Sequence, residues 1–150
     1  MAEVNPTGLD AYKPAEIADL VEAAGVAKAK LGFVRMLTLA ALAGAFIALG
    51  AAAYTMVMTG VDSGYGPARF LGGVVFSLGL ILVIVGGAEL FTGNALMVMA
   101  AVDRKITAGQ LGRNWAIGYV GNFIGALAIA VAMALTGSLD GAAGHLSLIH

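Results

Sequence analysis

The sequence contains no cysteine and few charged residues, and these absences exclude several classes of protein. Without cysteine the chain has neither disulfides nor thiolate metal sites. Charged residues make up 11% of its 150 residues, whereas a soluble domain carries about 25%. No histidine lies in a long apolar run, so haem or metal ligation there has few ligands to use. There is no basic stripe of the kind that binds nucleic acid. We therefore expect no cofactor, no metal, no nucleic-acid partner and no enzymatic activity.

Hydrophobic residues make up 60% of the sequence and gather in three charge-free runs, residues 36–61, 70–88 and 114–139. A helix needs about 20 apolar residues to cross a hydrocarbon layer about 30 Å thick. The runs therefore predict an all-α membrane protein. We expect a membrane domain over residues 36–135, with spans at about 36–58, 70–102 and 115–135, followed by a tail over 136–150.

Residues 1–35 are predicted to form an N-terminal segment that contains an amphipathic helix. Pro14 suits the first turn of a helix, and apolar residues follow on one helical face at Ile17, Leu20, Val21 and Ala24. We expect this helix to lie on the membrane surface or against the base of the protein. A solvated leader that packs on nothing is the alternative.

Basic residues near the ends of the spans predict the orientation, because cytoplasmic loops carry an excess of Lys and Arg. Three of them precede the first span, namely Lys28, Lys30 and Arg35, and three more lie between residues 103 and 113. Arg69 alone lies between the first two spans. We therefore expect the N-terminus and the 103–113 loop in the cytoplasm. Three crossings then place the C-terminal tail outside.

The second apolar segment, residues 70–102, contains a single charge, Glu89, and is unusually long. As a straight helix it would measure roughly 50 Å, at about 1.5 Å per residue. One crossing leaves on the order of ten residues in excess, and three crossings do not fit. Non-helical backbone inside a membrane is tolerated only where it is buried in protein or lines a cavity. We therefore expect a break between about Leu80 and Glu89, where glycines are frequent, that lines a path for a small solute.

Three polar residues, Glu89, Thr92 and Asn94, cluster at the end of this break and are candidates for the wall of the path. A carboxylate at mid-membrane is costly and is usually functional or paired. A half-helix that begins inside the membrane presents free N–H groups and a positive dipole end, which favours an anion as the solute. Glu89 then has two interpretations, direct contact with the solute or a cap on those N–H groups. Thr92 also has a simpler role, a hydrogen bond back to its own helix.

Small residues at helical spacing on the first and third spans indicate close packing of helices in lipid. Gly44 belongs to such a stripe on the first span, and Gly121 and Gly125 form a GxxxG pair around Asn122 on the third. We interpret Gly121, Asn122 and Gly125 as helix-packing residues. Asn122 is more typical of a hydrogen bond between helices than of a ligand.

The broken segment carries a specific sequence pattern. Residues 76–80 read Phe-Ser-Leu-Gly-Leu, and residues 87–94 read Gly-Ala-Glu-Leu-Phe-Thr-Gly-Asn. These blocks closely resemble the second membrane segment of the formate/nitrite transporter family. The resemblance runs from about Lys28 to Leu135 and continues through Ile106-Thr107, Asn114-Trp115 and Tyr119-Val120-Gly121-Asn122.

The resemblance implies an architecture and a function. Members of that family are pentamers of six-span protomers, and each protomer has its own pore between two inverted, aquaporin-like halves whose second and fifth spans are broken. Phe76 and Leu80 match positions that form apolar constrictions, although four residues apart they also suit plain packing on one helical face. Thr92 matches a polar position that hydrogen-bonds to a histidine on the fifth span. The solutes are small monovalent anions such as formate, nitrite or hydrosulfide, often moved with a proton, and we expect an inner-membrane location.

The sequence departs from the family pattern after its third span. The family's fifth-span histidine and fourth-span lysine are absent, and His145 and His150 lie in the tail, where they do not match that histidine. We therefore expect the first half of the fold only, as a fragment, a frameshifted copy or a half-protein that pairs with another half. On its own the chain is expected not to transport formate or nitrite into liposomes.

Two other functions stay open at this point. A neutral-solute channel of the water/glycerol kind would carry Asn-Pro-Ala in its half-helices, but the only Asn-Pro here is Asn5-Pro6, outside the spans. A non-transporting structural subunit is the second alternative. Unaltered anion flux after a Thr92→Ala change in the full-length parent would favour it.

Overall fold

The computed structural model describes residues 12–62 and 64–137, and within them every regular element is a helix. In chain order the elements are α1 (Pro14–Ala29), α2 (Phe33–Met58), α3 (Gly66–Val85), α4 (Phe91–Asn94), the 3₁₀ turn η1 (Ala95–Met97), α5 (Val98–Val102) and α6 (Ala108–Leu135). The all-α prediction is confirmed. Most of the expected tail, including His145 and His150, lies outside the described residues.

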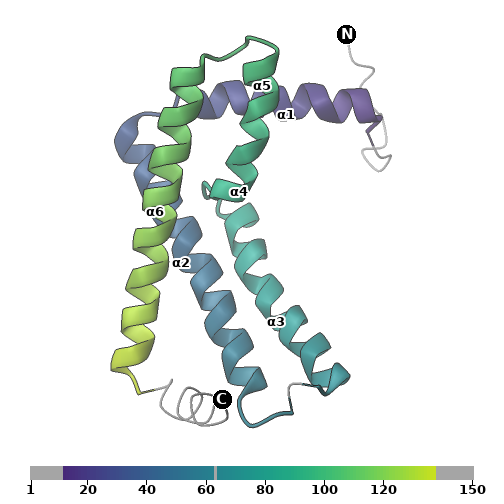
Figure 1. Cartoon of the computed structure of the whole chain (residues 1–150), viewed down its shortest axis with the longest axis vertical. Coiled ribbons are helices and arrows are strands. Elements are labelled where there is room, and N and C mark those ends of the chain that lie inside the picture. Colours follow the sequence, from purple (N-terminus) through teal and green to yellow (C-terminus); the bar gives the residue numbers. More distant parts are fainter. Residues whose placement is uncertain (1–11, 63, 138–150) are drawn as a thin grey trace.

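Three helices, α2, α3 and α6, are long and apolar enough to cross a membrane. They run along the length of the molecule, while α1 lies across one end, next to the loop that joins α5 to α6 (Figure 1). All three begin before the spans expected from the apolar runs. α2 begins at Phe33, α3 at Gly66 and α6 at Ala108, because each charge-free run starts only after an arginine that lies inside the helix. At α6 the side chains of Thr107 and Gln110 form a capping box.

The second apolar segment is interrupted, as expected, and the interruption covers residues 86–90. Gly87 has φ +59°, a left-handed conformation that glycine adopts without strain. The N–H of Ala88 donates to Val83 O at 2.9 Å, and the N–H of Gly87 donates to Ile84 O at 3.2 Å. These bonds form a Schellman motif, which ends a helix. The break therefore lies at the late end of the interval expected from the sequence.

Beyond the break the chain turns helical again. The elements α4, η1 and α5 together form one short apolar helix, Phe91–Val102, which we call the half-helix. It leads from the end of α3 toward the end of the molecule that carries α1 (Figure 1). The chain thus builds one long span from two pieces joined by five non-helical residues.

α2 packs against α6 through glycines that bring the two backbones together. A Cβ added at Gly44 would overlap the backbone of Asn122, and a Cβ added at Gly125 would overlap that of Ala41. Gly121 meets the Cβ of Ala40 in the same way. Because the hydrophobic effect does not drive helices together in lipid, such close approach supplies the van der Waals contact that holds them.

Gly125→Ala is expected to lower the free energy of unfolding by about 2 kcal/mol, because the new methyl group would force two backbones apart. Gly112→Ala on the same helix is the matched control, since an added Cβ there would meet nothing within 4 Å and alanine is the better helix former. Unfolding in detergent, followed by the fluorescence of Trp115, the only tryptophan, measures both. Equal losses in the two variants would contradict close packing of α2 on α6.

α1 lies where the sequence predicts a helix, but it packs through a different face. Its buried residues are Glu22, Gly25 and Ala29, whereas Ile17 and Leu20 of the expected face are 48% and 51% exposed. Gly25 allows close approach, since a Cβ there would lie 3.5 Å from Met97 Cα. The C-terminal part of α1 therefore packs on the half-helix.

Candidate functional site

The break is held by hydrogen bonds to both neighbouring spans. The N–H of Glu89 donates to Leu39 O of α2 at 3.1 Å. From α6, the Asn122 amide donates to Glu89 O at 3.0 Å and to Ala40 O at 2.8 Å, and its Oδ1 accepts the N–H of Phe91 at 2.8 Å. Backbone groups inside a membrane must find partners within the protein, because no water is there to bond them. Asn122 therefore joins α2, the break and the half-helix.

Glu89 forms a buried ion pair with Lys28 of α1. The Nζ of Lys28 lies 2.9 Å from Glu89 Oε2 and 2.8 Å from Asn94 Oδ1. The Glu89 side chain is 8% exposed, and the Lys28 side chain is 28% exposed. A buried carboxylate needs such a partner because removing a lone charge from water is strongly unfavourable. The ammonium group of Lys28 thus balances the negative charge of Glu89.

Asn94 and Asn114 extend this ion pair into a network of buried polar side chains. The Nδ2 of Asn94 donates to Asn114 Oδ1 at 2.9 Å, and the Nε1 of Trp115 donates to Asn94 O at 2.9 Å. Asn94 and Asn114 are 0% and 1% exposed. In the part of the chain that the structure describes, no buried side-chain N or O atom lacks a hydrogen bond. The network is therefore complete without a ligand.

Aromatic contacts fix the first residue of the half-helix. The ring of Phe91 meets the rings of Trp115 and Tyr119 edge-on, with centroid distances of 6.4 Å and 5.8 Å. Aromatic rings prefer this arrangement because the positive edge of one ring meets the negative face of the other. Phe91 is thus held by its side chain through these rings and by its backbone through Asn122.

Of the five residues expected to line the path, Phe76, Leu80 and Thr92 lie on surfaces that the described part of the chain leaves open, whereas Glu89 and Asn94 are buried. Phe76 is 39% exposed and Leu80 is 47% exposed. Thr92 is exposed, and its hydroxyl has no hydrogen-bond partner among the described residues. Neither full burial of Phe76 and Leu80 nor a bond from Thr92 back to its own helix is found there.

Thr92 stands at the start of the half-helix, where backbone N–H groups have no helical acceptor. Asn122 accepts the N–H of Phe91, and the N–H of Asn94 donates to Leu90 O at 3.0 Å. The N–H groups of Thr92 and Gly93 remain available beside the Thr92 hydroxyl. This end of the half-helix therefore offers donors that suit an anion.

The polar candidates thus separate by position. Glu89 and Asn94 are buried in the network, whereas Thr92 is open. The Glu89 carboxylate does not cap the half-helix, because Asn122 takes that place. Sequence reasoning missed Lys28 as the partner of Glu89. The rule that an intramembrane carboxylate needs a partner indicates that one exists, but 61 residues separate the two and no local pattern identifies which basic residue it is.

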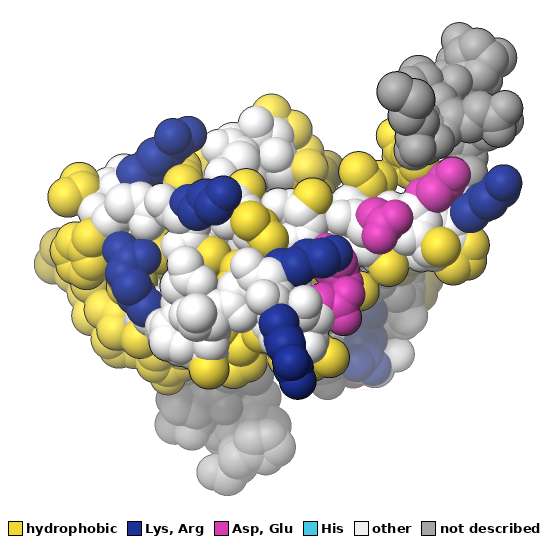
Figure 2. All heavy atoms as spheres, turned by 90° about the horizontal axis from the view of Figure 1, so that it is seen from above, with side chains coloured by type: hydrophobic (Ala, Val, Ile, Leu, Met, Phe, Trp, Pro, Cys, Tyr) yellow, Lys and Arg dark blue, Asp and Glu magenta, His cyan; other side chains and the backbone are white. Residues whose placement is uncertain are grey.

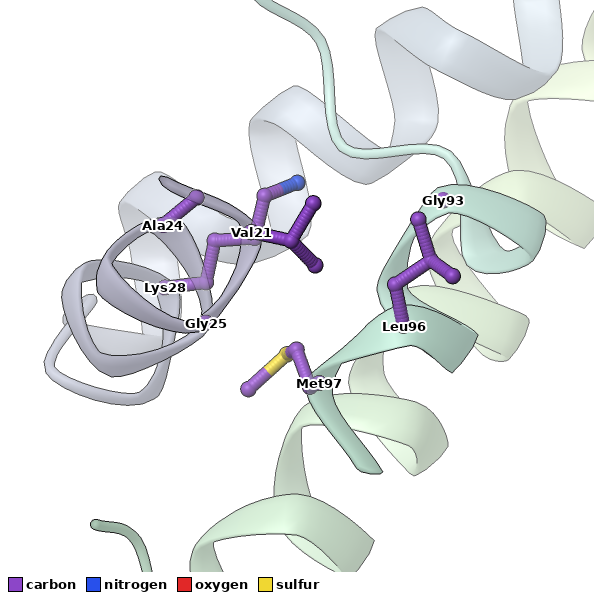
Figure 3. Close-up of a pocket in the computed structure, with 7 residues that line it drawn as sticks. All are labelled: Val21, Ala24, Gly25, Lys28, Gly93, Leu96 and Met97. Carbon is purple, nitrogen blue, oxygen red and sulfur yellow. The ribbon is translucent and has the colours of Figure 1, made fainter. Parts of the chain in front are cut away.

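A hollow of ≈160 Å³ lies between α1 and the half-helix (Figure 3). The hollow is lined by Val21, Ala24, Gly25 and Lys28 of α1 and by Gly93, Leu96 and Met97 of the half-helix. Because Gly93 directly follows Thr92, the hollow borders the start of the half-helix.

No group of His, Asp or Glu side chains suited to a metal ion occurs within residues 12–62 and 64–137.

A second ion pair ties α1 to the loop between α5 and α6. Glu22 pairs with Lys105, and the Nζ of Lys105 also lies 4.0 Å from Asp103 Oδ2. The hydrogen bond from Lys105 holds the pKa of Glu22 below its ordinary value of 4.5, although partial burial acts in the opposite direction. The same hydrogen bond raises the pKa of Lys105 above 10.5. The pair is therefore fully charged at neutral pH.

The stability that Glu22 contributes is expected to be lost in acid. Because its folded-state pKa is lowered, the contribution is complete above the unfolded-state value of about 4.5 and falls as pH drops through the folded value. The difference in free energy of unfolding between the native chain and Glu22→Gln should therefore stay constant from about pH 7 to pH 5 and shrink below about pH 4.5. Unfolding at a series of pH values measures it. A difference that persists unchanged at about pH 3 would contradict the pairing.

Comparison with known proteins identifies relatives that match most of the chain. The family model for formate/nitrite transporters matches residues 15–149. The chain is 41% identical over 140 residues to the formate channel FocA of Escherichia coli (strain K12), an alignment that covers 93% of this chain and 49% of that protein. It is 39% identical over 130 residues to the formate channel BtFdhC of Bacillus thuringiensis, covering 85% and 50%. A solved FNT family ion channel superposes with a TM-score of 0.75 at 24% identity, covering 82% of this chain and 50% of that one.

Proposed function

This chain belongs to the formate/nitrite transporter family, and we propose on that premise that it forms one wall of a membrane path for formate. Two of the relatives it matches are named formate channels, and it spans about half the length of each. The opposite wall is then supplied by a second half that these 150 residues do not contain. Nitrite, the other solute in the name of the family, is the second candidate.

The observation that carries this proposal is the open surface beside the break. Ala88 and Glu89 are buried against the rest of the chain, whereas Gly86, Gly87 and Thr92 are exposed. Non-helical backbone in a membrane is tolerated only where protein covers it or where it lines a cavity. On one side, α2 and α6 cover the backbone of the break. On the side that carries Thr92 the described part of the chain does not cover it, so the condition holds there if this surface lines a path.

The side chains on this surface suit proton-linked transport of a weak acid. An apolar constriction excludes water and ions, and Phe76 and Leu80 supply such a surface one helical turn apart on α3. Formate crosses it poorly as an anion but far better as neutral formic acid. The Thr92 hydroxyl can donate or accept a hydrogen bond, so it can contact either form of the solute beyond the constriction.

The ion pair of Lys28 and Glu89 has a positioning role in this proposal. A free carboxylate beside the path would repel formate, but Glu89 is 8% exposed and lies 2.9 Å from the Lys28 ammonium group. The pair, together with Asn94 and Asn122, holds the half-helix at the angle that presents Thr92. In this proposal these residues do not contact the solute; they position the half-helix that carries Thr92.

We further propose a homopentamer in the inner membrane, with the N-terminus in the cytoplasm. Six of the basic residues support this orientation, because they lie on or beside α1 and the loop between α5 and α6, at one end of the molecule. Only Arg69 lies near the start of α3, at the other end. The six residues are Lys28, Lys30, Arg35, Arg104, Lys105 and Arg113.

A chimera tests the transport function. Residues 1–136 replace the matching half of the formate channel FocA of Escherichia coli, to which this chain is 41% identical. Liposomes that hold the chimera are expected to take up formate, and liposomes that hold residues 1–150 alone are not. Thr92→Ala in the chimera should lower uptake about tenfold, the effect of losing a hydrogen bond of about 1.4 kcal/mol.

The control is Thr55→Ala, because the hydroxyl of Thr55 bonds back to Ala51 O within α2 and lies away from the break. It should leave uptake unchanged. Formate uptake by residues 1–150 alone would contradict the need for a second half. A chimera that passes water or glycerol but not formate would contradict the anion path, and equal uptake by the Thr92→Ala variant would remove Thr92 from it.

A further inference from the structure

Three of the basic side chains at the α1 end of the molecule lie near the turn between α1 and α2 and have no acidic partner among the described residues. Lys30 follows the last residue of α1, Arg35 lies in the first turn of α2 and Arg113 lies in the second turn of α6. All three are exposed. The ion pairs that the structure records use Lys28 and Lys105 instead.

One hydrogen bond places the Arg113 side chain beside the turn that joins α1 to α2. The Nη1 of Arg113 reaches across from α6 and donates to Leu31 O at 3.2 Å. Leu31 directly follows Lys30 and lies four residues before Arg35. Lys30, Arg35 and Arg113 therefore all lie on or next to the turn between α1 and α2, and we call these three residues the basic corner.

The segments of the described chain that carry the basic corner contain no acidic residue. No Asp or Glu occurs between residues 23 and 61 or between residues 104 and 139, the segments that contain the corner and both helices behind it. In the view onto this end of the molecule, the acidic side chains gather at one side and basic side chains on the opposite side stand apart from them (Figure 2). The corner therefore has a net positive charge that an external anion can balance.

Apolar side chains lie directly beside the corner. Phe33 and Val34, between Leu31 and Arg35, are 57% and 74% exposed. They begin α2, one of the helices long and apolar enough to cross a membrane. A small soluble anion gains nothing from contact with apolar side chains. A phospholipid can contact them with its acyl chains while its charged headgroup binds the basic residues.

We propose that the basic corner binds the phosphate of an anionic phospholipid in the membrane leaflet on the α1 side, with an acyl chain against Phe33 and Val34. The guanidinium groups of Arg35 and Arg113 match phosphate with paired N–H donors, and Lys30 adds a third positive charge. Basic sites between spans at the membrane surface bind lipid headgroups in this way. The inference is independent of which solute the path carries.

Native mass spectrometry of the purified chain in a neutral detergent tests the proposal, by titration with phosphatidylglycerol or with phosphatidylcholine of the same acyl chains. The first phosphatidylglycerol is expected to bind at least about fivefold more tightly, and Lys30→Gln and Arg35→Gln should each weaken it about fivefold, as expected for one basic residue at a lipid surface. Lys30→Gln is informative even if other variants fold poorly, since the Lys30 side chain is exposed and has no hydrogen bond or ion pair among the described residues.

Two variants that remove the same charge elsewhere are the matched controls. Lys13→Gln changes the other end of α1, and Arg69→Gln changes the start of α3. Both should bind phosphatidylglycerol as the native chain does. Equal affinity for the two lipids, or equal weakening by all four variants, would overturn the proposal. Displacement of the lipid by millimolar inorganic phosphate would also overturn it, because the corner would then be a site for the free anion.

Discussion

Replacing Lys28 by methionine is expected to lower the free energy of unfolding by about 3 kcal/mol. The substitution keeps most of the side chain but leaves the Glu89 carboxylate, 8% exposed, without its cation at 2.9 Å. Burial decides the magnitude. An exposed ion pair contributes about 0–1 kcal/mol, whereas removing one partner of a buried pair costs about 3–5 kcal/mol. The lower end applies because Lys28 is itself 28% exposed. Unfolding in detergent, read from Trp115 fluorescence, measures the loss.

A double variant separates the lost ion pair from lost packing. Adding Glu89→Gln to Lys28→Met removes the unpaired charge, and the double variant should recover more than half of the stability that the single variant loses. Lys30→Met is the matched control, because that side chain is exposed and Lys30 lies two residues from Lys28, directly after the last residue of α1. If Lys28→Met unfolds like the native chain, or if the double variant is less stable than the single one, the buried pair does not have the role described above.

Asn122→Leu is expected to lower the free energy of unfolding by a similar amount, about 3 kcal/mol. The substitution leaves buried backbone groups at the break without hydrogen-bond partners, and each such group costs about 1–3 kcal/mol. The N–H of Phe91 loses its acceptor, and Glu89 O loses its donor. The side chain of leucine is close in size, so the loss is one of hydrogen bonds rather than volume. Hydrogen exchange should show faster exchange of the Phe91 amide, in addition to the lower stability measured by unfolding.

Asn122→Asp refines this prediction. The aspartate keeps the acceptor for Phe91 but loses both donated bonds, to Ala40 O and to Glu89 O. It also adds a charge close to the break. Ser77→Ala is the control, since the hydroxyl of Ser77 bonds only to Val74 O in its own helix, and it should change stability by less than about 0.5 kcal/mol. An Asn122→Leu variant as stable as Ser77→Ala would show that the half-helix is held by other contacts.

The sequence predicts the interruption well because its causes are local. A straight helix over residues 70–102 would be longer than one crossing needs, and the Gly86-Gly87 pair supplies the left-handed residue that a Schellman motif requires. The expected interval began too early, at Leu80. Gly79 lies inside that interval but remains helical, because its missing side chain serves close packing against Phe46 O of α2 instead. A glycine in a membrane helix has both uses, and its neighbours in space decide between them.

The partners of the break were not predictable in the same way. Asn122 is typical of a hydrogen bond between helices, but nothing in its neighbours indicates that it accepts the N–H of Phe91, 31 residues earlier in the chain. Lys28 lies near the end of α1, whose apolar periodicity predicts that the face with Ile17 and Leu20 is buried. The face of α1 that is in fact buried contains Gly25, which allows the half-helix to approach closely. Both contacts depend on how separate elements meet, which periodicity within one element does not describe.

The hydrogen bonds around the break also define an order of assembly. A ribosome produces Lys28 first, Glu89 next and Asn122 last. The second span therefore leaves the ribosome with a carboxylate and open backbone groups whose final partners lie partly in a span not yet made. Until α6 arrives, the Phe91 N–H and Glu89 O can be bonded only by water or by the machinery that inserts the chain. We therefore expect membrane insertion to be cooperative over the three long apolar helices, rather than the addition of one finished helix after another.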